Sequence, residues 1–191
     1  MKKIILGSGS PRRRELLACL DLEFTVDTGN TFEESLEPGT APALVPVHMA
    51  AGKSHGFHRP LEPDEILITA DTVVITEGRV LGKPHSYDEA FQMLRSLSGR
   101  THEVITAVTI RTAGKEESFS DSTSVTFEEM TDSEIGYYIE KYRPYDKAGA
   151  YGIQEWIGYT SISRIEGSFY NVMGFPTHRV HEALKSFLQA D

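Results

Sequence analysis

The fold of this chain is decided by residues 3–17, KIILGSGSPRRRELL, which join a strand to a helix. The apolar run at 3–6 predicts a short buried strand. Ser10 followed by Pro11 predicts the N-cap and the first residue of a helix, whose apolar stripe includes Leu16. A strand that passes through a Gly-Ser turn directly into a helix is typical of α/β proteins.

The first turn of this predicted helix holds three consecutive arginines, Arg12, Arg13 and Arg14. Cations are unfavourable at a helix N-terminus, because its free N–H groups and partial positive charge suit an anion. Either a bound phosphate compensates the arginines, or they form a solvated basic patch that nearby carboxylates neutralise. The turn is not a P-loop, since the pattern G-x-x-x-x-G-K-[ST] is absent from it.

Strand-like and helix-like segments alternate along the rest of the chain. The run 65–81 predicts two strands broken at Asp71-Thr72, and 143–161 is predicted to be mostly loop. This order favours an α/β fold with a mixed sheet over a purely parallel one. We expect one domain spanning 1–191, either compact or with two lobes around a cleft. The other predicted strands are 23–28, 102–130 (as two or three strands) and 161–167, and the predicted helices are 41–57, 86–99, 131–142 and 176–189.

The composition of the 191 residues is that of a soluble globular protein, with 39% hydrophobic and 25% charged residues and a net charge of −9. This charge argues against non-specific nucleic-acid binding, which needs many clustered cations, but not against a local phosphate cleft. The single cysteine, Cys19, builds neither a disulfide nor a zinc site and is predicted to be a core residue. With no membrane-length apolar run and no signal peptide evident, we expect a cytoplasmic protein that binds no membrane and no nucleic acid.

Several charged residues stand where an uncharged one would be less costly. Asp71 interrupts the apolar run ITADTVV, so its carboxylate is expected to be paired, metal-bound or at a strand end facing a cleft, unless it only caps a turn. Lys53 ends a predicted helix and Lys83 lies in LGKPH, and each is ordinary alone. Glu33 and Glu34 lie in a polar loop, where acidic residues are usually solvated.

Two glycine-punctuated segments lack a regular hydrophobic period, YDKAGAYGIQ at 145–154 and GSFYNVMGFP at 167–176. Their small residues permit close approach of the backbone to a flat or charged ligand. Gln154 can both donate and accept hydrogen bonds, which suits the edge of a base. The alternative is that both segments are structured turns packed on the core. His178 and His181 have no evident third partner and are interpreted as surface histidines.

Eight segments, taken together and in order, resemble the Maf family of nucleoside triphosphate pyrophosphatases, which is named for septum formation. The resemblance extends from residue 4 to about residue 180, which is nearly the whole chain. The segments are SGSPRRRELL, EES, the helix that carries Lys53, ADTVV, GKP, ML…LSGRTHEVITAV, DKAGAYGIQ and GSFYNVMGFP.

The resemblance implies a fold like that of the inosine triphosphatases, with a twisted mixed sheet, flanking helices and a central nucleotide-binding cleft. It implies hydrolysis of a nucleoside triphosphate between the α and β phosphates, with Mg²⁺, in a homodimer. A house-cleaning role and a link to arrest of cell division are also implied. Two alternatives stay open: a non-catalytic nucleotide sensor or partner-binding septum regulator, and a nucleotidyltransferase, for which no acceptor site is evident.

The family's site residues carry over by position. Asp71 matches the proposed general base, but a carboxylate among several cations is a weak base. We therefore expect Asp71 to orient water and to share Mg²⁺ with Glu34. Whether Glu33 or Glu34 faces the cleft is left open by their adjacency. The other matching cleft residues are Ser8, Arg12, Arg13, Glu34, Lys53 and Lys83.

Three positions separate the branches of the family by substrate, and this chain has Arg12, Thr72 and Gln154 there. That set matches the branch that acts on dTTP and UTP. The branch that acts on 7-methyl-GTP carries an aromatic residue, a Gln and a Glu instead. The resemblance therefore implies a pyrimidine triphosphate substrate, whose base edge Thr72 and Gln154 recognise.

Overall fold

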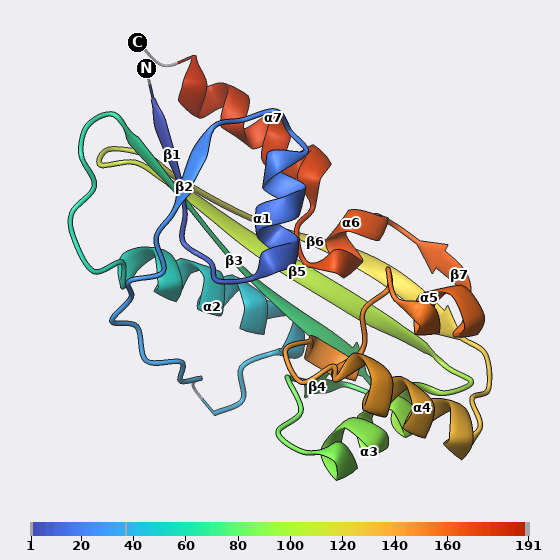
Figure 1. Cartoon of the computed structure of the whole chain (residues 1–191). Helices are drawn as coiled ribbons and strands as arrows, with labels where there is room; N and C mark the ends of the chain where they lie inside the picture. The colour runs from blue at the N-terminus through green and yellow to red at the C-terminus, as the bar shows by residue number, and fades with distance from the viewer. Residues whose placement is uncertain (1, 37, 190–191) are drawn as a thin grey trace. The chain divides into compact units, whose positions relative to one another are not determined.

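The computed structural model describes residues 2–36 and 38–189 (Figure 1). The strands are β1 (Lys3–Leu6), β2 (Phe24–Val26), β3 (Glu65–Thr76), β4 (Arg79–Leu81), β5 (Thr101–Arg111), β6 (Glu116–Phe127) and β7 (Ile162–Glu166). The helices are α1 (Pro11–Ala18), α2 (Val45–His55), α3 (Tyr87–Leu97), α4 (Asp132–Tyr142), α5 (Trp156–Ser161), α6 (Phe169–Met173) and α7 (Thr177–Leu188), with single 3-10 turns η1 (Pro42–Leu44) and η2 (Ala148–Ala150).

The described strands form a seven-stranded sheet in the order β2-β1-β3-β5-β6-β7, with β4 paired to β3. β1 runs parallel to β2 and to β3, whereas the pairs β3–β4 and β6–β7 are antiparallel. The α/β fold with a mixed sheet that the sequence predicts is therefore confirmed. The strands β3, β5 and β6 each contribute residues to two compact units of the chain.

The first unit is built on the parallel strands β1 and β3. Their registered residues Ile5 and Leu67 pack with Phe57 and Leu61 in a buried cluster. Both strands bury consecutive residues rather than alternate ones, which is typical of a parallel sheet covered on both faces. The unit consists of the described residues of 1–71, 106–121 and 174–191.

The second unit has its own core beneath α3 and α4. A capping box starts α4: the Thr131 N–H donates to Glu134 Oε2 at 2.7 Å, and the Glu134 N–H donates to Thr131 Oγ1 at 3.3 Å. The core includes Val74, Leu94, Leu97, Phe127, Ile135, Tyr138, Ile139 and Ile157. The unit consists of residues 72–105 and 122–173.

Three predictions from the sequence are wrong in detail. β3 continues through Asp71-Thr72 without a break, because the Asp71 carboxylate has an ion-pair partner and the strand has no need to end. The stretch 143–161 contains η2 and α5, which the sequence hides because Gly158 interrupts the helical pattern. Cys19 is exposed rather than buried, since α1 ends at Ala18 and the helical period no longer applies beyond it.

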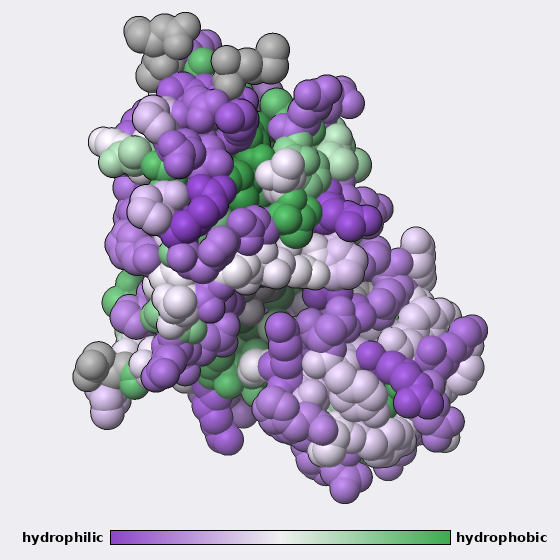
Figure 2. All heavy atoms as spheres, turned by 60° about the vertical axis from the view of Figure 1, so that its left-hand side comes forward, coloured by the Kyte–Doolittle hydropathy of each residue, from purple (hydrophilic) through white to green (hydrophobic). Residues whose placement is uncertain are grey.

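The face drawn in Figure 2 is covered mainly by hydrophilic side chains. Among the residues described, no helix combines the length and the apolar character that crossing a bilayer requires.

Candidate active site

The turn between β1 and α1 gathers hydrogen bonds on two serine hydroxyls. Ser10 is the N-cap of α1, and its Oγ accepts the Arg13 N–H at 3.5 Å. Ser8 Oγ accepts both the Ser10 N–H at 3.3 Å and Arg13 Nη1 at 3.2 Å. Since these bonds use the lone pairs of the Ser8 oxygen, its proton is left to donate to an acceptor such as a phosphate oxygen. The N–H groups at the start of α1 suit the same anion.

Arg13 connects this turn to the residue before Asp71. Its Nη1 donates to the Ala70 carbonyl at 2.9 Å, and its Nε donates to the Gly174 carbonyl at 2.9 Å. Burial lowers the pKa of the Arg13 guanidinium, whereas the charge of Asp71 raises that pKa. A guanidinium remains charged at neutral pH regardless. Arg13 therefore braces the site as well as lending it positive charge.

The two arginines that neighbour Arg13 differ from each other in exposure. Arg12 is half-buried, and its charge contributes to the lowered pKa of Arg13. Arg14 is exposed to solvent.

Lys53, near the end of α2, joins the two acidic residues of the predicted site. Its Nζ lies 2.7 Å from Asp71 Oδ1 and 2.9 Å from Glu34 Oε1. The Asp71 side chain is 19% exposed and that of Glu34 is 60% exposed, so the pair opens toward solvent on the side of Glu34. Of the two adjacent glutamates, Glu34 is therefore the one that reaches Lys53. The structure brings Glu34, Lys53 and Asp71 into one cluster.

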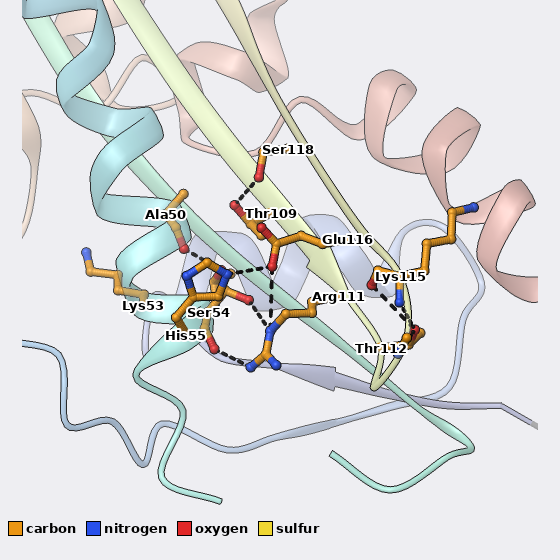
Figure 3. Close-up of polar contacts among 12 residues, drawn as sticks. Ala50, Lys53, Ser54, His55, Thr109, Arg111, Thr112, Lys115, Glu116 and Ser118 are labelled. Carbon is orange, nitrogen blue, oxygen red and sulfur yellow. Dashed lines mark hydrogen bonds and ion pairs between the residues drawn. The ribbon is translucent and has the colours of Figure 1, made fainter. Parts of the chain in front are cut away.

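The end of α2 that carries Lys53 is held by polar contacts to the sheet (Figure 3). Thr69 Oγ1 donates to the Ala50 carbonyl at 2.8 Å, one turn before Lys53. Arg111 Nε donates to Ser54 Oγ at 2.9 Å, and its Nη2 donates to the Ser54 carbonyl. A cation on the last carbonyls of a helix also complements the helix dipole.

Glu116 of β6 adds further contacts to this end of α2. His55 Nε2 lies 2.7 Å from Glu116 Oε2, and Arg111 Nε lies 3.9 Å from the same oxygen. Both residues that follow Lys53 are thus tied to the β5–β6 hairpin, which restricts the position of the lysine.

The loop that carries Glu34 packs into a notch at the end of α2, the space that Gly52 and Gly56 leave open. A Cβ at Gly52 would lie 2.3 Å from the Phe32 ring, and one at Gly56 would lie 2.6 Å from Phe32 Cβ. Asn30 Nδ2 also donates to the Lys53 carbonyl at 2.6 Å. Because Phe32 fills the space that the glycines leave, Glu34 two residues later is brought to Lys53.

The remaining predicted residues belong to the second unit. Thr72 is half-buried in β3, and Lys83 is exposed in the segment between β4 and α3. Gln154 is half-buried, and its Oε1 is shielded from solvent with no hydrogen-bond donor from any residue that the structure describes. The Gly149 N–H donates to the Gly82 carbonyl at 3.0 Å, so the segment that precedes Gln154 is tied to the residue before Lys83.

The donor set of the first unit fits a divalent cation of the Mg²⁺ type. No group of three or more His, Cys, Asp or Glu side chains gathers among the described residues. Mg²⁺ commonly takes only one or two protein carboxylates and completes its octahedron with water and substrate phosphates. Glu34 and Asp71, already drawn together by one ammonium group, provide such a pair.

Sequence reasoning missed the residues that hold the site residues in place. Arg111 ends an ordinary strand and Phe32 lies in a polar loop, and neither carries a local signal. The spacing of Gly52 in α2 and Gly56, the residue just after it, was the one available hint, because glycines four apart open a notch at the end of a helix. His178 and His181 are both exposed.

A family model described as "Maf-like protein" matches residues 3–187. A "dTTP/UTP pyrophosphatase" of Porphyromonas gingivalis is 51% identical over 187 residues, covering 97% of this chain and 94% of that protein. Proteins with the same name are 49% identical in Phocaeicola vulgatus (96% of this chain, 95% of that protein) and 45% identical in Flavobacterium johnsoniae (97% and 95%).

Among solved structures, "Structure of a HAM1 protein from Coxiella burnetii" matches with a TM-score of 0.41 and 15% identity. The match covers 66% of this chain and 73% of that one. A similarity this low carries no argument about the chain.

Proposed function

We propose, since the chain belongs to the Maf-like protein family, that it is a pyrophosphatase which hydrolyses dTTP and UTP to the nucleoside monophosphate and pyrophosphate. The observation that carries this proposal is the Lys53 bridge between Asp71 and Glu34, in the same unit as the Ser8–Arg13 turn. This arrangement places anion-binding groups and two carboxylates on neighbouring residues, as Arg13 itself contacts the residue before Asp71.

Such a site acts mainly through charge and position. A nucleoside triphosphate carries about four negative charges, which donors at the β1–α1 turn, Arg12 and Arg13 stabilise on one side. Lys53 supplies further positive charge for the departing pyrophosphate, a role that the family resemblance also gives to Lys83. Ser8 donates its proton to a phosphate oxygen, because its lone pairs are already engaged.

Glu34 and Asp71 are the residues that would hold the divalent cation, Mg²⁺ being the expected ion. When bound, such an ion supplies Lewis-acid stabilisation and lowers the pKa of a bound water molecule. Lys53 contacts the same two carboxylates, so it keeps them together and limits their mutual repulsion. Asp71 orients the attacking water by accepting a hydrogen bond from it.

Base selection is assigned to Arg12, Thr72 and Gln154. The Gln154 amide offers one acceptor and two donors, which can pair with the imide edge of uracil or thymine. A site that hydrogen-bonds a base edge discriminates strongly, because a wrong base leaves buried polar groups unpaired.

The proposal is tested by measuring pyrophosphate release with Mg²⁺ from dTTP, UTP, CTP, GTP, ATP and 7-methyl-GTP, with the Asp71→Asn variant beside the wild type. We expect preferential turnover of dTTP and UTP. In Asp71→Asn, kcat should fall by about 10²-fold or more while nucleotide binding persists, because the change removes the water-orienting charge. Turnover of GTP equal to that of UTP would refute the selectivity. A raised KM at unchanged kcat in Asp71→Asn would refute its catalytic role.

Nucleotide binding without turnover in the wild type would favour the nucleotide-sensing alternative over an enzyme. The homodimer is a further part of the proposal, supported by the family resemblance. Light scattering of the purified protein tests it, and a mass of one chain would contradict it.

A further inference from the structure

A buried ion pair lies beside Gln154 in the second unit. Lys147 Nζ is 3.1 Å from Glu155 Oε1 and 2.8 Å from Asp146 Oδ1, and the Lys147 side chain is only 9% exposed. Removing an ammonium group from water is costly unless it is paired and hydrogen-bonded. A buried lysine that binds no phosphate is therefore expected to have a structural or functional role of its own. Neither Lys147 nor Glu155 has a role in the proposed hydrolysis.

Tyr138 connects this ion pair to the backbone of the same turn. Its hydroxyl donates to Glu155 Oε2 and accepts the Gly152 N–H at 2.9 Å. Burial and the neighbouring Glu155 raise the pKa of Tyr138, so the hydroxyl keeps its proton and remains a donor. Tyr138 therefore contacts the chain on both sides of Gln154.

Backbone contacts complete the enclosure of residues 152–155. The Glu155 N–H donates to the Gly152 carbonyl at 3.0 Å, and the Gly158 N–H donates to the Glu155 carbonyl at 2.9 Å. A Cβ at Gly152 would lie 2.9 Å from Glu155 Cδ and 3.0 Å from Lys147 Cε, so only glycine leaves room for the ion pair. The turn that presents Gln154 is thus determined by side chains distant in sequence.

The orientation of the Gln154 amide decides which pyrimidine it can bind. Uracil and thymine present an N3–H donor beside the O4 acceptor, whereas cytosine presents the N3 acceptor beside the N4 amino donor. An amide that rotates freely by half a turn pairs with either edge. Gln154 Oε1 is shielded from solvent and lacks a donor among the described residues. In this orientation the oxygen can accept the N3–H of uracil or thymine.

We propose that Tyr138, together with the Lys147–Glu155 ion pair, positions Gln154 and thereby sets the preference for uracil and thymine over cytosine. The inference rests on the proposed function, in which Gln154 contacts the base. Tyr138 and the ion pair act through Gln154 and are positioning residues.

The test compares Tyr138→Phe with the matched control Tyr137→Phe on the same helix. Tyr137 is exposed, and its hydroxyl accepts from Lys141 Nζ at 2.7 Å on the surface. In Tyr138→Phe the ratio of kcat/KM for UTP to that for CTP should fall about tenfold, because the turn that carries Gln154 loses its hydrogen bonds at Gly152 and Glu155. The control should keep the wild-type ratio. In a Gln154→Ala background, Tyr138→Phe should leave the ratio unchanged.

An activity-independent readout separates this inference from the proposed function. The side-chain amide resonances of Gln154 are assigned by their absence in Gln154→Ala, and they should shift in Tyr138→Phe and in Glu155→Gln but not in Tyr137→Phe. Unshifted resonances, or an unchanged UTP to CTP ratio in Tyr138→Phe, would overturn the inference. If the wild type hydrolyses no nucleotide, the proposed function fails, and the resonances still decide whether Tyr138 positions Gln154.

Discussion

The contact between Phe32 and α2 predicts that Gly52→Ala impairs catalysis more than folding. The added methyl group would lie 2.3 Å from the Phe32 ring. To restore ordinary contact in a close-packed interior the ring must retreat by about 1 Å. The ring carries with it the loop that holds Glu34, which is two residues away and 2.9 Å from Lys53.

Two opposing terms set the stability of this variant. Overpacking costs about 1–3 kcal/mol, whereas alanine is favoured over glycine inside a helix by about 1 kcal/mol. The free energy of unfolding should therefore fall by no more than about 2 kcal/mol, which leaves the protein folded. A displacement of about 1 Å in a reacting group costs about 10²-fold in rate, so kcat should fall by about 10- to 100-fold.

The assay is pyrophosphate release from UTP at saturating Mg²⁺, paired with urea unfolding. Gly114→Ala is the matched control, because a Cβ there meets nothing within 4 Å. We expect Gly114→Ala to keep the wild-type kcat. A Gly52→Ala protein with wild-type kcat would show that the contact of Phe32 with Gly52 does not position Glu34, and would refute the prediction.

Two further predictions concern Arg111 and His102. Arg111→Met leaves the Ser54 carbonyl and hydroxyl without their donor, so it should lower the free energy of unfolding by about 1–3 kcal/mol in urea titrations and reduce kcat through Lys53. The control is Lys115→Met, which removes a cation of the same hairpin; Lys115 Nζ lies 2.8 Å from Ser186 Oγ, and the variant should keep the wild-type kcat. An equal loss of kcat in both variants would contradict the role of Arg111. Burial lowers the pKa of His102 to about 4, so between pH 6.5 and pH 4 the unfolded chain binds a proton that the native protein does not. Stability from this residue is therefore present above pH 6.5 and lost as the pH falls, by about 3 kcal/mol in all, and His102→Gln should flatten the difference in unfolding free energy between pH 7 and pH 5.

Local patterns in the sequence predicted much of the secondary structure. Ser10 caps α1 and Thr131 with Glu134 forms the capping box of α4, because both motifs depend on residues within one helical turn. Glu77 and Gly78 form a turn that is equally local, since both residues have positive φ in a hairpin that pairs Thr76 with Arg79. Asp71 stood out as a charge in an apolar run, and its partner Lys53 was named without a derivation of the contact.

The sequence by itself thus determined the α/β class, the capped helices and the family to which the chain belongs. Only the tertiary structure decided that β3 continues through Asp71, that Glu34 rather than Glu33 meets Lys53, and that Phe32 occupies the notch of Gly52 and Gly56. The physical reason is the range of the interactions. Caps and turns are satisfied within a few residues, so they leave a local signature. The packing of Phe32 on α2 and the bonds of Arg111 to Ser54 join segments far apart in the chain, and their energy exists only once the chain has folded.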